Sequence, residues 1–216
     1  MTIHTAIPDY AAARAAMIDS QLRPEGVTDA AVLAAMAAVS RERFVPEAAR
    51  ALAYGDRAVP LGQGRSMMAP AALGLLLTEL APRAGERALV VGAGGGYSAA
   101  LLARIGLEVT ALESSPALAA AAKANGVTVA EGALTDGHAA GAPYDLILID
   151  GAVEQVPQAL VDQLADGGRL GTALSARGVT RLAIGRKAGG GFGLHSIADA
   201  GVAALPGFAR PAEFTF

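Results

Sequence analysis

The spacing of hydrophobic and polar positions changes repeatedly after residue 80, and this pattern predicts an α/β fold. Residues 88–91 are all apolar, which is typical of a strand buried on both faces of a sheet. Residues 98–105 then place apolar side chains at helical spacing, and the alternation continues along the chain. We therefore expect a doubly wound, mostly parallel sheet. Further strands are predicted at residues 108–112, 127–130, 145–149 and 169–174, and further helices at residues 116–125 and 157–164.

The first 80 residues show helical spacing without intervening strands, which predicts an N-terminal helical extension. Asp9 begins a first helix that ends near Pro24, and Thr28 caps a second helix. Residues 51–66 contain several glycines and a proline and show no clear period, so we expect an ordered loop there. A helix over residues 70–80 follows, with its proline in the first turn.

The end of the chain predicts a different kind of strand at one edge of the sheet. Residues 181–186 and 214–216 look extended, and a glycine-rich turn lies between them and runs through Gly193. We expect these strands to lie antiparallel at the sheet edge. The whole chain, residues 1–216, is then one domain, with a helical extension over residues 1–80 and an α/β core over residues 81–216.

Composition excludes several classes of protein. The chain has 216 residues, no cysteine and 3 scattered histidines, which excludes disulfides and predicts no metal site. A net charge of -3 with dispersed basic residues predicts no nucleic-acid partner. Alanine supplies much of the 53% hydrophobic content, and the longest apolar run, residues 67–77, is shorter than the ~20 residues of a membrane span. We therefore expect a soluble, cytoplasmic protein with no membrane partner.

A glycine-rich loop at residues 92–97 follows the first predicted strand of the core. Glycines let the backbone turn tightly and approach a ligand closely, and the following helix directs its N-terminal amides to the same place. Tyr97 stands where a dinucleotide fingerprint needs its third glycine, so the loop favours S-adenosylmethionine over NAD. Glu113 ends the next strand, where an acid can accept hydrogen bonds from both ribose hydroxyls. A purely structural turn and a solvated surface glutamate are the alternatives.

Five motifs in order resemble the protein-L-isoaspartate O-methyltransferase family. They are RERFVP at residues 41–46, AYGD at residues 53–56, the glycine loop with Tyr97, APYD at residues 142–145, and VPQALVDQLADGGRL at residues 156–170. The resemblance runs from about Met17 to the C-terminus. It implies a seven-strand methyltransferase fold and S-adenosylmethionine as cofactor. It also implies methyl transfer to the free carboxylate of an isoaspartyl residue in a damaged protein or peptide, the first step of repair.

The resemblance also implies which residues form the site. Ser66 keeps a hydroxyl in the loop that faces the substrate. Asp150 ends the fourth core strand, where many methyltransferases keep a substrate-facing group, whereas the isoaspartyl family tends to have small residues there. A carboxylate nucleophile has a pKa near ~4, so it is ionised at pH 7 and needs positioning rather than a general base. The implied cofactor-binding residues are Gly92, Ala93, Gly94, Gly95, Gly96, Tyr97, Glu113, Ser114, Ala133 and Asp136.

Three positions depart from the family pattern. Met68 stands where the family carries a serine, Val90 where it carries an acid in the first core strand, and Ala133 where it carries an aspartate near the adenine. Asp136 is a candidate substitute from the same loop. These departures keep open an alternative function as a non-catalytic binding module, and an NAD-dependent oxidoreductase is a third hypothesis.

Two arginines flank the predicted substrate loop. Arg57 and Arg65 have the side chain to hold a carboxylate bidentately, but we expect both to be solvated. The sequence leaves the oligomeric state open.

Overall fold

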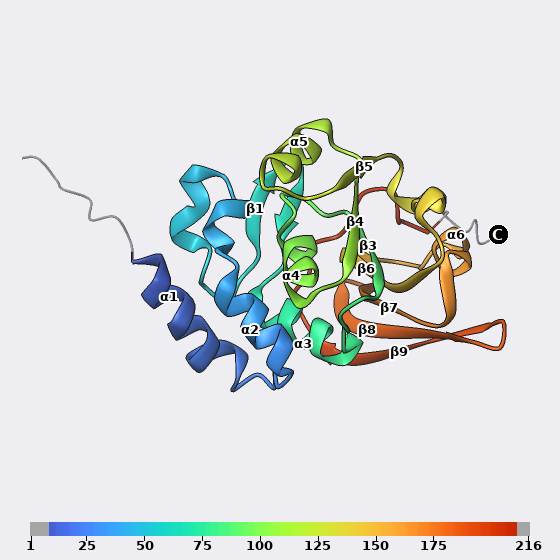
Figure 1. Ribbon diagram of the computed structural model, residues 1–216, viewed down its shortest axis with the longest axis horizontal. Helices are drawn as coiled ribbons and strands as arrows, with labels where there is room; N and C mark the ends of the chain where they lie inside the picture. The colour runs from blue at the N-terminus through green and yellow to red at the C-terminus, as the bar shows by residue number, and fades with distance from the viewer. Residues whose placement is uncertain (1–8, 211–216) are drawn as a thin grey trace, which may run out of the picture.

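A seven-stranded sheet forms the centre of the computed structural model, which describes residues 9–210 (Figure 1). The strand order is β5-β4-β3-β6-β7-β8-β9. Strands β5 to β7 run parallel, whereas β8 and β9 are antiparallel to their neighbours. The structure confirms the predicted doubly wound fold with an antiparallel edge. The strands are β3 (Arg87–Val91), β4 (Glu108–Glu113), β5 (Val129–Glu131), β6 (Tyr144–Val153), β7 (Leu164–Ala176), β8 (Val179–Ala188) and β9 (Gly191–Asp199).

The helices begin where the sequence supplies helix-starting residues. The Ser115 side chain accepts a hydrogen bond from Leu118 N at the start of α5, and Pro70 occupies the first turn of α3. Asp29, not Thr28, caps α2, because its carboxylate accepts a hydrogen bond from Val32 N. The helices are α1 (Tyr10–Met17), continued by a π-helical turn (Ile18–Leu22), α2 (Ala30–Ala38), α3 (Pro70–Leu80), α4 (Tyr97–Ile105), α5 (Pro116–Ala124) and α6 (Gln158–Asp162).

Side chains alternate along β3 and divide the core into two layers. Ala88 and Val90 face one cluster, which the first four helices cover. Leu89 and Val91 face the other, which α6 and the segment after β9 cover. Figure 1 shows α1 and α2 gathered beyond one end of the sheet and the β8–β9 hairpin extending at the other. The sheet is therefore buried on both faces, as the apolar strands predicted.

The segment predicted as a loop is more regular than expected. Residues after Pro46 form a 3₁₀ helix, Glu47–Leu52, and a hairpin of β1 (Val59–Gly62) and β2 (Arg65–Met67) follows. The loop prediction was wrong because Gly62, Gln63 and Gly64 all adopt positive φ and form a tight turn between strands. The strand predicted at residues 214–216 lies outside the described residues. Three further 3₁₀ turns are Arg41–Phe44, Leu134–Asp136 and Ala139–Gly141.

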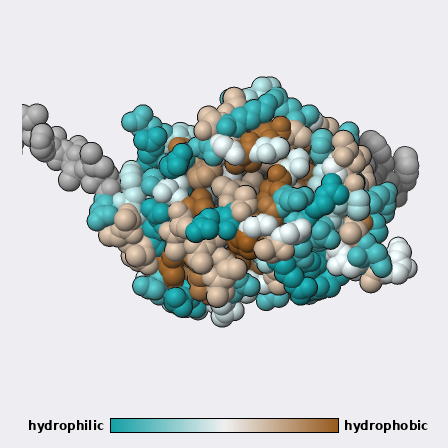
Figure 2. Space-filling view, in the orientation of Figure 1, coloured by the Kyte–Doolittle hydropathy of each residue, from teal (hydrophilic) through white to brown (hydrophobic). Residues whose placement is uncertain are grey.

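The surface combines polar residues with apolar patches. Figure 2 shows hydrophobic residues gathered near the middle of this face, with hydrophilic residues around them. Within residues 9–210, no helix has the length and apolar character needed to cross a membrane.

Candidate active site

The glycine loop connects the C-terminal end of β3 to the start of α4. Gly92, Gly94 and Gly96 have φ of 74°, 56° and 94°, values that an L side chain rarely adopts. Gly92 N donates to Leu112 O of β4 at 2.8 Å, which fixes the loop against the neighbouring strand. The sequence therefore places the loop where parallel α/β sheets bind ligands.

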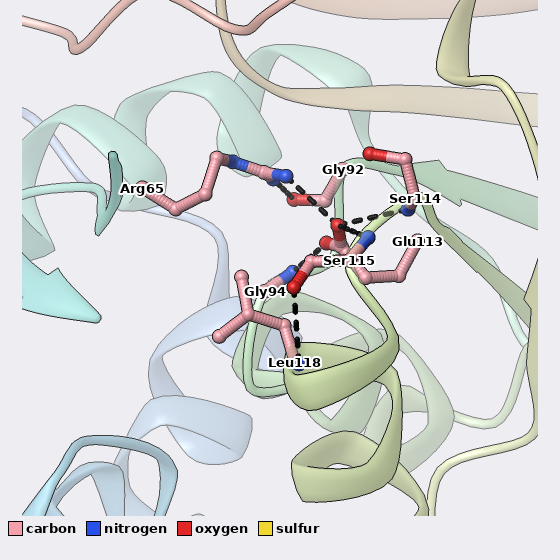
Figure 3. Close-up of polar contacts among 7 residues, drawn as sticks. All are labelled: Arg65, Gly92, Gly94, Glu113, Ser114, Ser115 and Leu118. Atoms are coloured by element: carbon pink, nitrogen blue, oxygen red, sulfur yellow. Dashed lines mark hydrogen bonds and ion pairs between the residues drawn. The ribbon is translucent and has the colours of Figure 1, made fainter. Parts of the chain in front are cut away.

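Glu113, the last residue of β4, points its carboxylate into this loop (Figure 3). Its exposure is 0%, so the solvated alternative was wrong. Oε2 accepts a hydrogen bond from Gly94 N at 2.8 Å. Oε1 accepts from Ser114 N at 2.9 Å and Ser115 N at 3.0 Å. The structure thus brings Glu113, the glycine loop and Ser114 together, as the sequence predicted.

Arg65 of β2 reaches the same carboxylate from the opposite side (Figure 3). Its Nη1 donates to Glu113 Oε1 at 2.9 Å, and its Nη2 donates to Gly92 O at 2.6 Å. The residue is only 6% exposed, so the prediction that Arg65 is solvated was wrong. Arg57 is exposed, as expected. The hairpin turn explains the difference, because it directs Arg65 inward.

Apolar side chains complete the cover over the loop. A Cβ built on Gly94 would lie 2.7 Å from Leu61 Cδ1, and one built on Gly92 would lie 3.0 Å from Leu205 Cδ2. Leu205 reaches the loop because its segment pairs with the end of β6. Leu205 N donates a hydrogen bond to Ala152 O at 2.8 Å, beside a bridge between Ala152 and Ala204. The remaining hollow has a volume of about 10 Å³. It is lined by Leu61, Ser66, Met67, Gly92, Ala93, Gly94, Gly95, Tyr97 and Asp150.

Asp150 and its neighbours form a second buried polar group beside the hollow. Asp150 lies within β6 rather than at its end as predicted, because the strand continues to Val153 past an irregularity in its pairing. Ser98 donates a hydrogen bond to Asp150 Oδ2. Burial raises the pKa of Asp150 to about 6, against the opposing effects of Ser98, Arg65 and Arg41. The carboxylate is therefore mostly ionised at pH 7, although desolvation destabilises its charged form.

Arg41 anchors the structure behind this group. The side chain is completely buried, and its Nε donates to Ala53 O at 2.7 Å. The guanidinium lies over the Tyr97 ring, 4.9 Å from the centroid, and its Nη2 donates to Met68 O. Burial lowers the pKa of Arg41 and raises that of Tyr97. Tyr97 thus packs against Arg41, and this contact positions the start of α4 next to the hollow.

The three departures from the family pattern occupy different environments. Met68 and Val90 are buried in the same hydrophobic core, which explains how the chain accommodates apolar side chains at both positions. Ala133 is exposed and begins a 3₁₀ turn just after Gly132, whose N donates to Glu113 O at 3.2 Å. The Asp136 carboxylate is exposed and accepts a hydrogen bond from Thr135, so its role as a substitute stays a prediction.

Sequence reasoning missed the residues that cover the site. The alternation of inward Val59 with outward Pro60, and the turn at Gly62 to Gly64, indicate a hairpin and could have placed Arg65 on its inner side. Leu205 had no comparable signal, since its position depends on a single bridge between Ala152 and Ala204.

The groups at this edge can hold a nucleoside, although the enclosed space cannot. A buried acid at the end of β4 beside a glycine loop is the arrangement by which doubly wound proteins bind ribose. However, a hollow of about 10 Å³ holds at most about one water molecule. The Glu113 carboxylate and the glycine loop therefore fit the ribose of S-adenosylmethionine. Arg65, Leu61 and Leu205 fill the space that the nucleoside would occupy. These features define a doubly wound protein of the nucleoside-cofactor class.

Comparisons with known proteins identify the family within that class. The family model for protein-L-isoaspartate(D-aspartate) O-methyltransferase matches residues 12–192. The chain is 47% identical over 171 residues to the protein-L-isoaspartate O-methyltransferase of Methylorubrum extorquens (strain PA1), covering 76% of this chain and 75% of that protein. It is 42% identical over 184 residues to protein-L-isoaspartate O-methyltransferase 1 of Rhodopseudomonas palustris (strain HaA2), covering 80% and 75%.

Solved structures show the same fold. A structure of a putative protein-L-isoaspartate O-methyltransferase from Plasmodium falciparum, in complex with S-adenosyl-L-homocysteine, has a TM-score of 0.77 and 20% identity. The match covers 92% of this chain and 99% of that one. A second protein-L-isoaspartate O-methyltransferase structure also has a TM-score of 0.77, with 23% identity and coverage of 90% and 66%.

The chain belongs to the protein-L-isoaspartate(D-aspartate) O-methyltransferase family. This membership confirms the predicted family, the methyltransferase fold and the class of enzyme, an S-adenosylmethionine-dependent methyltransferase. The comparisons give no support to the alternative of a binding module.

Proposed function

We propose that the protein transfers a methyl group from S-adenosylmethionine to the free carboxylate of isoaspartyl residues in damaged proteins or peptides. The observation that carries this proposal is the contact between the Glu113 carboxylate and the glycine loop, at 2.8 Å from Gly94 N, in a chain of this family. The names of its relatives support the substrate, and the P. falciparum structure with S-adenosyl-L-homocysteine supports the cofactor.

The cofactor residues act by binding and orientation. When bound, S-adenosylmethionine supplies a methyl group activated by a positive sulfonium. Glu113 would accept hydrogen bonds from the ribose hydroxyls, and Oε2 is the more available oxygen because it accepts only from Gly94 N. The glycine loop allows close approach of the ligand to the backbone, and Ser114, next to Glu113, forms the turn after β4. These roles need no side chain that gains or loses a proton.

The substrate residues lie beside the hollow. Ser66 is partly buried there, and its hydroxyl can donate a hydrogen bond to the substrate carboxylate. That carboxylate is ionised at pH 7 and attacks without a general base. Asp150 carries negative charge at pH 7, because its pKa is about 6, and this charge attracts the positive sulfonium.

Tritium transfer from labelled S-adenosylmethionine to an isoaspartyl peptide tests the proposal. The matched control is the same peptide with a normal aspartyl residue, which should receive no label. Glu113→Gln should raise the KM for S-adenosylmethionine by about 10-fold to 150-fold, because a charge-assisted hydrogen bond contributes ~1.5–3 kcal/mol. Ser66→Ala should lower kcat. Equal labelling of the two peptides by the wild type would contradict the proposal.

A further inference from the structure

The carboxylate that should receive the ribose already has four donors. The Glu113 carboxylate accepts four hydrogen bonds: from Gly94 N, Ser114 N, Ser115 N and Arg65 Nη1. Oε1 accepts three of these hydrogen bonds and Oε2 accepts one, so the bond from Arg65 falls on the more crowded oxygen. Three of the four donors are backbone groups fixed by the turn after β4 and by the glycine loop. Arg65 is the donor that comes from a separate element, as Figure 3 shows.

The same arginine also occupies the space beside the glycine loop. A Cβ built on Gly92 would lie only 2.8 Å from Arg65 Nη2, which donates to Gly92 O. Leu61 lies on the same hairpin, and its Cδ1 would be 2.7 Å from a Cβ built on Gly94. The close approach that the glycines permit is therefore made by side chains of the chain itself. A ligand that contacts Glu113 and Gly92 together must displace Arg65.

The hairpin that carries Arg65 is separate from the main sheet. Strands β1 and β2 form a two-stranded sheet and do not pair with the seven-stranded one in the described residues. Isolated two-stranded hairpins are marginally stable in water, so side-chain packing holds this one in place. The inward side chains are those of Val59, Leu61, Arg65 and Met67, whereas the turn at residues 62–64 is exposed. Movement of the hairpin uncovers part of the core at Val59 and Met67 but breaks no strand pairing of the central sheet.

Charge explains why the arginine belongs at this position. Glu113 is fully buried, and a buried carboxylate needs compensation. Arg65 supplies that compensation through an ion pair of 2.9 Å whose side chains are 5% and 0% exposed. Both the arginine and the sulfonium cofactor carry positive charge. Either can therefore balance the negative carboxylates at this edge of the sheet.

We infer that Arg65 is an internal competitor of the cofactor: it occupies the ribose acceptor Glu113, and the β1–β2 hairpin must withdraw before the nucleoside binds. Arg65 thereby sets cofactor affinity. This inference rests on the proposed function, because it assigns the contacts of the same cofactor site. The apparent affinity is the intrinsic affinity reduced by the fraction of molecules with the hairpin withdrawn.

Calorimetry with S-adenosylhomocysteine tests the competition on the full chain. The variants are wild type, Arg65→Gln and Arg57→Gln, the last being the matched control because Arg57 is an exposed arginine in the same segment. Arg65→Gln removes the charge and leaves Glu113 with its three backbone donors. We expect it to bind S-adenosylhomocysteine at least tenfold more tightly than wild type, whereas Arg57→Gln should match wild type. Arg65→Lys, which keeps the charge but cannot contact Glu113 and Gly92 as a planar fork, should fall between.

The outcomes separate the two proposals. Binding to Arg65→Gln that equals or is weaker than binding to wild type overturns the competition but leaves the proposed function intact. Binding to none of the variants contradicts both the cofactor site and the competition. Circular dichroism shows whether Arg65→Gln is folded, and Arg65→Lys provides the same comparison if it is not.

Discussion

Two arginine–glutamate pairs lie at opposite ends of the sheet, one partly buried and one fully buried, and they differ in what each glutamate depends on. At the end where the parallel strands begin, Arg169 donates to both carboxylate oxygens of Glu86. The distances are 3.0 Å from Nη1 to Oε1 and 2.7 Å from Nη2 to Oε2. Arg169 Nε also donates to Leu80 O at 2.7 Å, which ties the end of α3 to β7. At the other end, Arg65 contributes one of four hydrogen bonds to Glu113, and backbone groups contribute three.

The comparison separates an arginine that stabilises the fold from one that holds a binding site closed. Glu86 relies on Arg169 for its strongest contacts. Burial alone would raise the pKa of Glu86, but the hydrogen bonds and charges of Arg169 and Arg83 together outweigh burial and lower it. Glu113 keeps an anion-binding set of backbone donors when Arg65 leaves. The first pair is therefore integral to packing, and the second is replaceable by a ligand.

The same substitution at both arginines should give the largest difference. Arg169→Gln removes a bidentate pair and leaves Glu86 and the α3 carbonyls short of donors, which should lower the free energy of unfolding by about 2–4 kcal/mol. Arg65→Gln should cost about 1.5 kcal/mol, the low end for a hydrogen bond to a charged group, since Glu113 retains three backbone donors. Urea denaturation measures both. An equal loss in the two variants would contradict the distinction between the pairs.

Asp150 provides a second contrast, because its charge at the cofactor end lacks full compensation. Its raised pKa means that the folded protein binds this proton more tightly than the unfolded chain does. This contribution to stability is present below pH about 4 and is lost as the pH rises through about 6. Asp150→Asn should therefore stabilise the protein by about 1–3 kcal/mol at pH 7 and by much less at pH 4.

Urea denaturation at the two pH values checks this expectation. The matched control is Asp19→Asn, at a carboxylate whose side chain is 76% exposed, and it should change stability by less than about 0.5 kcal/mol. A loss of stability for Asp150→Asn at pH 7 would show that Ser98 and the nearby arginines fully compensate the charge.

The smallest effect is expected at the loop after β5. Ala133 is exposed and follows Gly132, which contacts Glu113 O, so Ala133→Asp adds an acid near the site with little strain. We expect S-adenosylhomocysteine to bind about three- to tenfold more tightly, below the ~1.5–3 kcal/mol of a fully buried charge-assisted bond. Calorimetry measures the change. Ala139→Asp, at another exposed alanine in the same connection, is the control and should leave affinity unchanged.

The alternation of core strands and helices along the chain and the place of the cofactor loop could be predicted because they depend on local signals. Apolar runs such as residues 88–91 mark buried strands, and the predicted helix over residues 70–80 has the observed bounds, Pro70–Leu80. Glu113 was placed correctly because a residue at the C-terminal end of a parallel strand meets the loop of its neighbour.

The cover over the site could not be predicted in the same way. The inward direction of Arg65 depends on the β1–β2 turn and on a partner 48 residues away in sequence. Leu205 depends on a segment that joins β6 through one bridge. The turn at residues 62–64 indicates a hairpin with Arg65 on its inner side, but no local pattern identifies the distant partners of Arg65 and Leu205.

A crystal structure of the wild-type protein with S-adenosylhomocysteine tests the central claim most directly. The account predicts that the ribose hydroxyls bind the Glu113 carboxylate and that the Arg65 guanidinium has left it, so that the present 2.9 Å contact is lost. Bound S-adenosylhomocysteine together with an intact Arg65–Glu113 ion pair would contradict the account.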